Sequence, residues 1–104
     1  MTKRSRISRK SAEQSVAIGH LINLSPESSQ LLEQVGIEDR QKLAELGSVG
    51  AYVEIHRKGL RPSLNLLYAL EGALRNMPWA NLPYHIRASL TLEADAILGS
   101  ESRV

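Results

Sequence analysis

The stretch SLNLLYALEGALRNM, residues 63–77, decides the fold of this 104-residue chain. Its apolar side chains recur every three or four positions, at Leu66, Leu67, Leu70, Ala73, Leu74 and Met77. That spacing places them on one face of an α-helix, because 3.6 residues complete one turn. Ser63 can cap the helix start and Pro78 ends it. The pattern therefore predicts a central helix packed against the rest of the chain.

Two shorter helices are predicted before this segment, and each ends at a glycine. Ser25 followed by Pro26 is typical of a helix start, and Gly36 can supply the left-handed residue that ends the helix. An acidic residue at 38 or 39 opens the second helix, which Gly47 closes. We expect Leu46 to lie on the inward face of this second helix.

Further helices are predicted from the same kinds of capping and helix-ending residues. Ser48 can cap a helix that Gly59 stops, and its apolar face is Val49, Tyr52 and Val53. Pro83 starts a last helix that reaches Gly99, with an apolar stripe made of Ile86, Leu90, Ala94 and Ile97. Near the N-terminus, Ser11 begins a capping-box pattern that predicts a short helix to about residue 18.

These signals define the fold class and the domain organisation. Phe is absent and no stretch alternates apolar and polar residues for long, so the strand signal is weak. We predict an all-α protein, a compact bundle of about five short helices. Residues 1–20 form a basic arm with room for one short helix, residues 21–99 form the helical domain, and residues 100–104 form a tail. The similarity between successive helix-glycine units is loose and indicates no internal repeat.

The amino-acid composition indicates the cellular compartment of the chain. The chain has no cysteine, which excludes disulfides and thiolate chemistry and suits a reducing compartment. The longest uninterrupted apolar run among the helix signals is far shorter than the roughly 18 residues that a membrane span requires. We therefore expect a cytoplasmic protein without a membrane partner.

The titratable residues do not form a catalytic or metal-binding sequence pattern. His20, His56 and His85 are far apart in the sequence, and none forms the His-x-x-x-His spacing that places two imidazoles on one helical face. No Gly-x-Ser-x-Gly or Gly-Lys-Ser/Thr motif is present. The sequence therefore predicts no enzyme, no metal and no cofactor.

A basic arm is the main feature of the charge distribution. Five of the thirteen basic residues fall in the first ten positions, namely Lys3, Arg4, Arg6, Arg9 and Lys10. The remaining eight are outnumbered by eleven acidic residues. Such an arm can neutralise nucleic-acid phosphates, and it can equally be a solvated tail that keeps the protein soluble. Both interpretations stay open, and the arm carries no aromatic residue for base stacking.

Several short motifs along the chain occur in the same order as in a known protein family. The motif residues are Leu21, Asn23, Leu24 and Pro26, then Gly36 and Ile37, the Leu-x-x-Leu-Gly at 43–47, Ala51 and Tyr52, the run from Leu64 to Ala73, and Trp79 with Leu82 and Pro83. Together they resemble the C-terminal domain of the TfoX/Sxy family, bacterial proteins linked to regulation of natural competence. The similarity covers about residues 21–98. Family members commonly carry a separate N-terminal domain, and we expect some twenty residues to stand in its place here.

The resemblance implies an all-helical fold akin to helix-hairpin-helix and SAM-like domains, and it implies no enzymatic activity. It leads us to expect a regulatory domain whose partner is a transcription protein or a second copy of the chain. The alternative is a small nucleic-acid-binding protein. In that case the five residues of the arm would bind the nucleic acid together with Arg57, Lys58 and Arg61, which can otherwise complement a helix C-terminus.

The hairpin itself departs from a phosphate-binding one. A helix-hairpin-helix motif binds phosphate through free backbone amides at a glycine-bearing turn, often beside a lysine. Here Ser25 stands where the family pattern has glycine, Glu27 and Glu33 accompany it, and no basic residue lies between Leu21 and Asp39. We therefore expect the hairpin to be structural or to face a protein.

Overall fold

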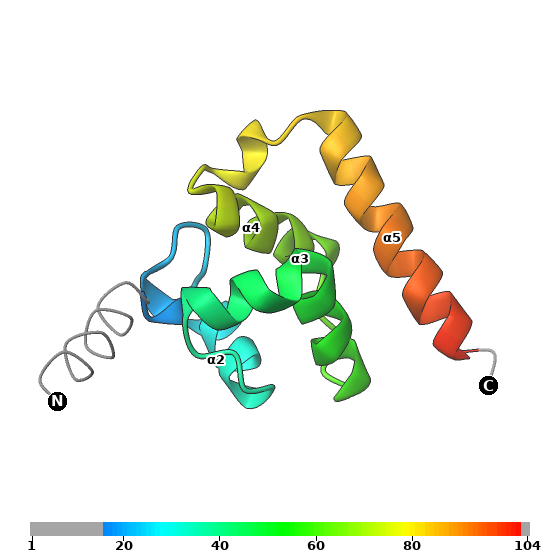
Figure 1. Ribbon diagram of the computed structural model, residues 1–104, viewed down its shortest axis with the longest axis horizontal. Helices are drawn as coiled ribbons and strands as arrows, with labels where there is room; N and C mark the ends of the chain where they lie inside the picture. The colour runs from blue at the N-terminus through cyan, green and yellow to red at the C-terminus, as the bar shows by residue number, and fades with distance from the viewer. Residues whose placement is uncertain (1–15, 103–104) are drawn as a thin grey trace, which may run out of the picture.

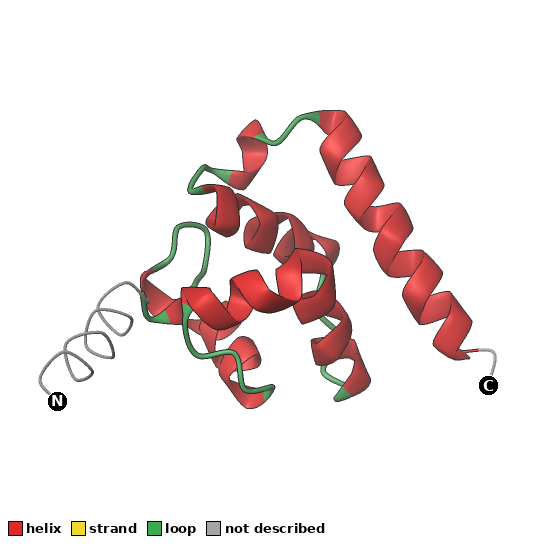
Figure 2. Cartoon of the chain, in the orientation of Figure 1, coloured by secondary structure: helices red, strands yellow, loops and turns green. Residues whose placement is uncertain are grey.

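Four α-helices form the part of the chain that the computed structural model describes, residues 16–102. They are α2 (Pro26–Gln34), α3 (Arg40–Arg57), α4 (Leu64–Arg75) and α5 (Tyr84–Ser102), joined by the short 3-10 helices η1 (Ile18–His20) and η2 (Trp79–Asn81). Figure 1 shows α3 and α4 side by side, with α5 along one edge of the molecule. No strand occurs within these residues (Figure 2), which confirms the predicted all-α class.

Local sequence signals set several helix boundaries as expected. The Ser25 hydroxyl accepts a hydrogen bond from the Ser28 amide at 3.1 Å, and Pro26 is the first residue of α2. The Asp39 carboxylate accepts from the Lys42 amide at 2.9 Å and caps α3. Both side chains satisfy amides that a helix start leaves without a partner in the helix.

The two helices predicted on either side of Gly47 meet there at a sharp kink and together make up α3. Gly47 has φ +77° and ψ 167°, a conformation essentially restricted to glycine, and helical structure resumes at once after it. The predicted cap at Ser48 is wrong. Its hydroxyl instead donates to Glu71 Oε1 on α4 at 2.6 Å, which ties the kink to the neighbouring helix. Leu46, predicted to face inward, is 37% exposed.

The central helix α4 is buried as predicted. Leu67 and Leu70 are fully buried against α3 and α5. The helix ends earlier than expected, because Asn76 adopts the left-handed conformation that closes a helix, before Met77 and Pro78. Ser63 occupies the N-cap position but makes no side-chain capping hydrogen bond.

The last helix, α5, extends beyond its predicted end. Leu90 and Ala94 are buried against the core, and Ile86 and Ile97 pack beside them as the stripe predicted. The helix passes through Gly99 to Ser102, so Gly99 does not end it. Most of the predicted helix at residues 11–18 lies outside the described residues, and Ile18 begins the 3-10 helix η1.

Two turns of the fold have the same hydrogen-bond pattern. Their similarity is closer than the loose resemblance between the helix-glycine units in the sequence. After α2, the amide of Gly36 bonds Glu33 O at 3.0 Å and that of Ile37 bonds Leu32 O at 2.9 Å. After α3, Gly59 bonds His56 O at 2.8 Å and Leu60 bonds Ile55 O at 3.2 Å. Both glycines have positive φ, and both turns lead into another helix. The described fold therefore contains two successive helix-turn-helix units of one design.

Candidate functional site

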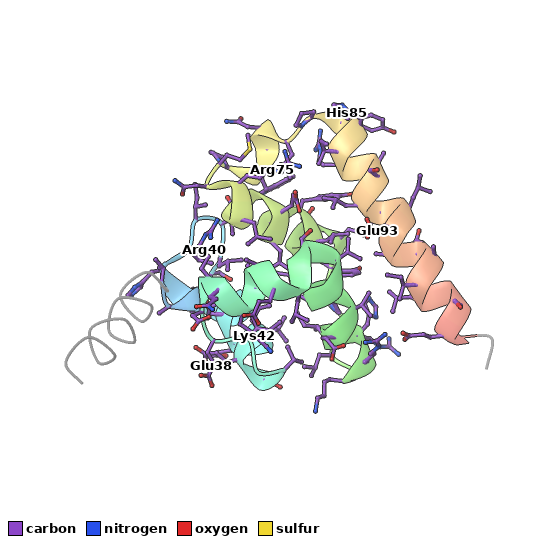
Figure 3. All side chains as sticks on the ribbon, in the orientation of Figure 1. Glu38, Arg40, Lys42, Arg75, His85 and Glu93 are labelled. Carbon is purple, nitrogen blue, oxygen red and sulfur yellow. The ribbon has the colours of Figure 1, made fainter. Side chains whose placement is uncertain are left out.

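The turn between α2 and α3 has backbone donors that are largely occupied within the chain. Besides the amides of Gly36 and Ile37, the Arg40 amide bonds Val16 O at 2.8 Å. The Lys42 amide is taken by the Asp39 carboxylate. Figure 3 shows Glu38, Arg40 and Lys42 around the start of α3, and the Arg40 guanidinium donates to Leu74 O of α4 at 2.7 Å. These contacts use the turn to hold the fold together and leave it poorly suited to an anion.

The predicted nucleic-acid residues fall into three groups in the structure. Arg57 lies at the end of α3 and forms ion pairs with Glu54 and, across to α5, with Glu101. Lys58 and Arg61 are exposed on the turn before α4, and neither forms an ion pair within residues 16–102. The five arm residues at positions 3–10 lie outside the described residues. The structure thus brings Lys58 and Arg61 together on one turn and assigns Arg57 to the α3–α5 contact.

The ion pair between Arg57 and Glu101 changes the pKa values of both side chains. The hydrogen bond from Arg57 lowers the pKa of the Glu101 carboxyl, and the opposite charge lowers it further. The same contact raises the pKa of Arg57. Since α5 has no other charged residue in its last two turns, this pair fastens the end of α5 to the end of α3.

The histidines show no convergence on a reactive site. The His56 ring lies edge-on to Tyr52 with 5.0 Å between ring centroids, and burial raises the pKa of the Tyr52 phenol, with the charge of Asp95 as the next cause. His20 and His85 are exposed, His85 at the first turn of α5 (Figure 3). Within residues 16–102, no three His, Cys, Asp or Glu side chains are grouped as metal ligands would be.

A polar clasp joins the loop after η1 to the end of α4. The Asn23 side-chain amide donates to Met77 O at 2.9 Å and, over a longer 3.4 Å, to Ala69 O. Its carbonyl accepts from the Trp79 amide at 3.2 Å. Gly72 makes room for this clasp, because a Cβ there would lie 2.5 Å from Asn23 Nδ2 and 2.7 Å from Met77 O.

An exposed apolar surface lies on α5, where no site was predicted. Tyr84 is 78% exposed and Leu92 is 70% exposed, well above the other large apolar residues of the described fold. A groove of about 710 Å³ runs between them and α4, lined by Tyr68, Tyr84, Arg87, Ala88, Thr91 and Leu92. We name this set the α5 groove.

The walls of the α5 groove are held in place by contacts within the fold. The Tyr68 hydroxyl and Thr91 Oγ1 are 3.0 Å apart, and the Tyr68 ring stacks on Trp79 with 6.2 Å between centroids. Arg87 enters the same groove, and its Nε is buried with no hydrogen-bond partner in the described part of the chain. A buried donor of this kind is unfavourable unless an acceptor completes it. The groove thus combines fixed aromatic walls, an exposed leucine and a cation with an unused donor.

Comparison with known proteins shows the family of the chain. The family model of the TfoX C-terminal domain matches residues 14–94. The chain belongs to the TfoX C-terminal domain family. No functionally curated protein matches it.

Two solved structures from Listeria monocytogenes share the fold of this family member. One is an uncharacterized protein in a triclinic crystal form, with a TM-score of 0.73 and 26% identity over 81% of this chain and 96% of that chain. The other is a protein of unknown function in a tetragonal form, with a TM-score of 0.68 and 28% identity over 71% of this chain and 91% of that chain. The fold therefore extends over nearly the whole of both relatives.

The residues that carry the TfoX resemblance have structural roles here. Asn23, Gly72 and Trp79 meet in the clasp at the end of α4, although the resemblance identified them as three separate motifs. The α5 groove, in contrast, was missed. Its sequence signal is Ala88, Leu92 and Ala96 at intervals of four, which fits the outward side of α5 as well as it fits a buried one. Within residues 16–102, no helix is both long enough and apolar enough to span a membrane.

Proposed function

We propose that this chain is a non-enzymatic regulatory domain of the TfoX type that acts through protein–protein contacts. One observation carries the proposal: α5 exposes Tyr84 and Leu92 beside a groove whose walls are fixed and in which Arg87 Nε has no hydrogen-bond partner among residues 16–102. Large exposed apolar side chains next to a cation suit a protein interface, where aromatic residues and arginine contribute most of the binding free energy.

Family membership gives the proposal its biological setting. The TfoX family is linked to natural competence, so the partner we propose is a transcription protein or a second copy of the chain in the cytoplasm. Residues 21–99 would provide the contact, with residues 1–20 as a basic arm. In this proposal the chain has no cofactor and no membrane partner.

A chromosomal substitution tests the proposal. In the organism that encodes the chain, Leu92→Glu should lower transcription of competence genes and transformation frequency to the level of a full deletion. Leu46→Glu is the matched control, since Leu46 is also a partly exposed leucine but lies on α3. Wild-type competence in the Leu92→Glu strain, at wild-type protein level, would count against the proposal.

A nucleic-acid-binding role is the second candidate, supported by Lys58 and Arg61 on the turn before α4. Both are exposed and unpaired within the described residues, and the arm could add five more cations. Each phosphate contact contributes about 0.9 to the slope of log affinity against log salt. Duplex binding should therefore become less salt-dependent in Lys58→Ala/Arg61→Ala and in a chain lacking residues 1–10. Absence of duplex binding at low salt excludes this role.

A further inference from the structure

The outward side of α5 forms a continuous stripe of apolar or small side chains. Ala88, Leu92, Ala96 and Gly99 follow one another at helical spacing, and Tyr84 precedes them by one turn. Ala96 and Gly99 are exposed, as are Tyr84 and Leu92, whereas the opposite side of the helix holds the buried Leu90 and Ala94. In Figure 1 the rest of the described fold lies on one side of α5 only. Small residues beside a central leucine allow another helix to approach closely.

The charges of α5 are divided between its two halves. His85 and Arg87 lie in the first half, and Glu93, Asp95 and Glu101 lie in the second. Figure 3 shows His85 at the start of the helix and Glu93 near its middle. This order opposes the helix dipole, which favours acidic residues near the N-terminus and basic residues near the C-terminus. The first turn of α5 indeed has no acidic residue, and the last turn has no basic one.

A helix running in the opposite direction would correct this arrangement. Its acidic half would lie beside the basic half of α5, including Arg87, whose buried Nε lacks an acceptor. The α5 helix of a second copy meets these requirements. In α5 the basic residues precede Leu92 and the acidic residues follow it, so two antiparallel copies place opposite charges side by side. Self-complementarity of this kind is what a twofold-symmetric interface requires.

We propose that a second copy of this chain docks on α5, with the two α5 helices antiparallel about a twofold axis near Leu92. In this arrangement Leu92 faces Leu92 of the second copy, Ala88 faces its Ala96, and Arg87 reaches its Asp95. The inference rests on the proposed function, since it names the partner that occupies the same α5 surface. A foreign helix with an acidic segment is the competing occupant, and the test separates the two.

The mass of the full chain in solution gives the first test. Sedimentation equilibrium should show a monomer–dimer equilibrium at protomer concentrations of roughly 10–500 μM, the range suited to an interface below about 1,200 Å². Leu92→Glu should raise the dissociation constant at least about tenfold, because the axis brings the two new carboxylates together. Leu46→Glu should leave it within about twofold of wild type. A wild-type chain that stays monomeric, or equal effects of both substitutions, overturns the inference.

Charge exchange gives the second test and separates a second copy from a foreign partner. Arg87→Asp alone sets acid against acid, and Asp95→Arg alone sets base against base, so each variant should be monomeric. An equimolar mixture of the two variants should form dimers again, since every mixed pair joins opposite charges at both ends. The far-UV circular dichroism of each variant verifies that it folds. Folded single variants that stay monomeric when mixed contradict the antiparallel pairing.

The outcomes also distinguish this inference from the proposed function. A monomeric wild-type chain, combined with loss of competence in the Leu92→Glu strain, leaves the proposed function standing with a foreign partner on α5. Dimers that obey the charge exchange, combined with normal competence in that strain, support the inference and count against the proposed function.

Discussion

Asn23 joins three backbone groups that are far away in the sequence. Its amide reaches Met77 O and Ala69 O, its carbonyl receives the Trp79 amide, and its own backbone adopts φ +75°. Asparagine tolerates this left-handed conformation better than most residues and has both a donor and an acceptor at the end of its side chain. The residue therefore fixes the course of the loop after η1 against the end of α4.

Replacement of Asn23 should destabilise the fold through this clasp. Asn23→Ala removes both the donor and the acceptor and leaves the part-buried backbone groups of Met77 and Trp79 unsatisfied, so we expect a loss of about 2–3 kcal/mol. Urea unfolding followed by circular dichroism measures the change. Asn65→Ala, on the exposed side of α4, is the control and should stay within about 0.5 kcal/mol of wild type. Equal stability of the two variants would show that the clasp contributes nothing.

Gly72 provides a second test at the same place. Alanine is normally the better helix former by about 1 kcal/mol. At Gly72 the added methyl group would collide with Asn23 Nδ2 and Met77 O, so Gly72→Ala should lower the free energy of unfolding by roughly 1–3 kcal/mol. At Gly50 of α3 the nearest atom to a new Cβ is 3.4 Å away, and Gly50→Ala should be neutral or stabilising. Thermal unfolding of both variants measures the difference. A Gly72→Ala variant more stable than wild type would contradict the close contact of Gly72 with Asn23 and Met77.

At the scale of elements, α3 and α5 are fastened at their ends by Arg57 and Glu101. The contact holds the pKa of Glu101 below its usual value of 4.5. A lowered pKa in the folded state means that the contact stabilises the fold above pH 4.5, and that this stabilisation is lost as the pH falls through the lowered pKa. Because both side chains are at the surface, the contribution is small and screened by salt.

The pH dependence of unfolding tests this contact. The melting temperature of wild type should exceed that of Glu101→Gln near neutral pH, and the difference should shrink as the pH falls below 4.5 and Glu101 becomes protonated. Melting curves at low ionic strength from neutral pH downward measure it, with Glu93→Gln as a control for the general effect of removing a carboxylate from α5. A wild-type advantage that does not shrink as the pH falls would show that the ion pair is not its source.

The local helix signals at Ser25, Gly36 and Gly59 were predicted correctly. Ser25, Gly36 and Gly59 act on backbone groups within a few residues, so their roles could be inferred without the fold. At Gly47 the break itself could be inferred locally, but the hydrogen bond from Ser48 to Glu71, 23 residues further along, could not. Likewise, α5 continues past Gly99 toward Glu101, whose partner Arg57 lies 44 residues earlier.

At the scale of the whole molecule, the candidate site was the part that the sequence predicted least. Arg57, Lys58 and Arg61 were identified by charge alone, and the structure shows that Arg57 is engaged in ion pairs while the other two are free of them within residues 16–102. The α5 surface was missed because α5 has apolar residues on two sides. Only the packing of α3 and α4 against Leu90 and Ala94 shows that Leu92 faces outward.

The central claim is that a second copy of the chain docks on this outward side of α5. Backbone amide chemical shifts of the full chain, recorded by NMR during dilution from about 1 mM to about 20 μM, test it most directly, since this range covers the affinity expected of a small interface. We expect concentration-dependent shifts in residues 84–99 and at Tyr68 of the groove wall. Shifts confined to the turn at residues 58–63, or none at all, would contradict the account.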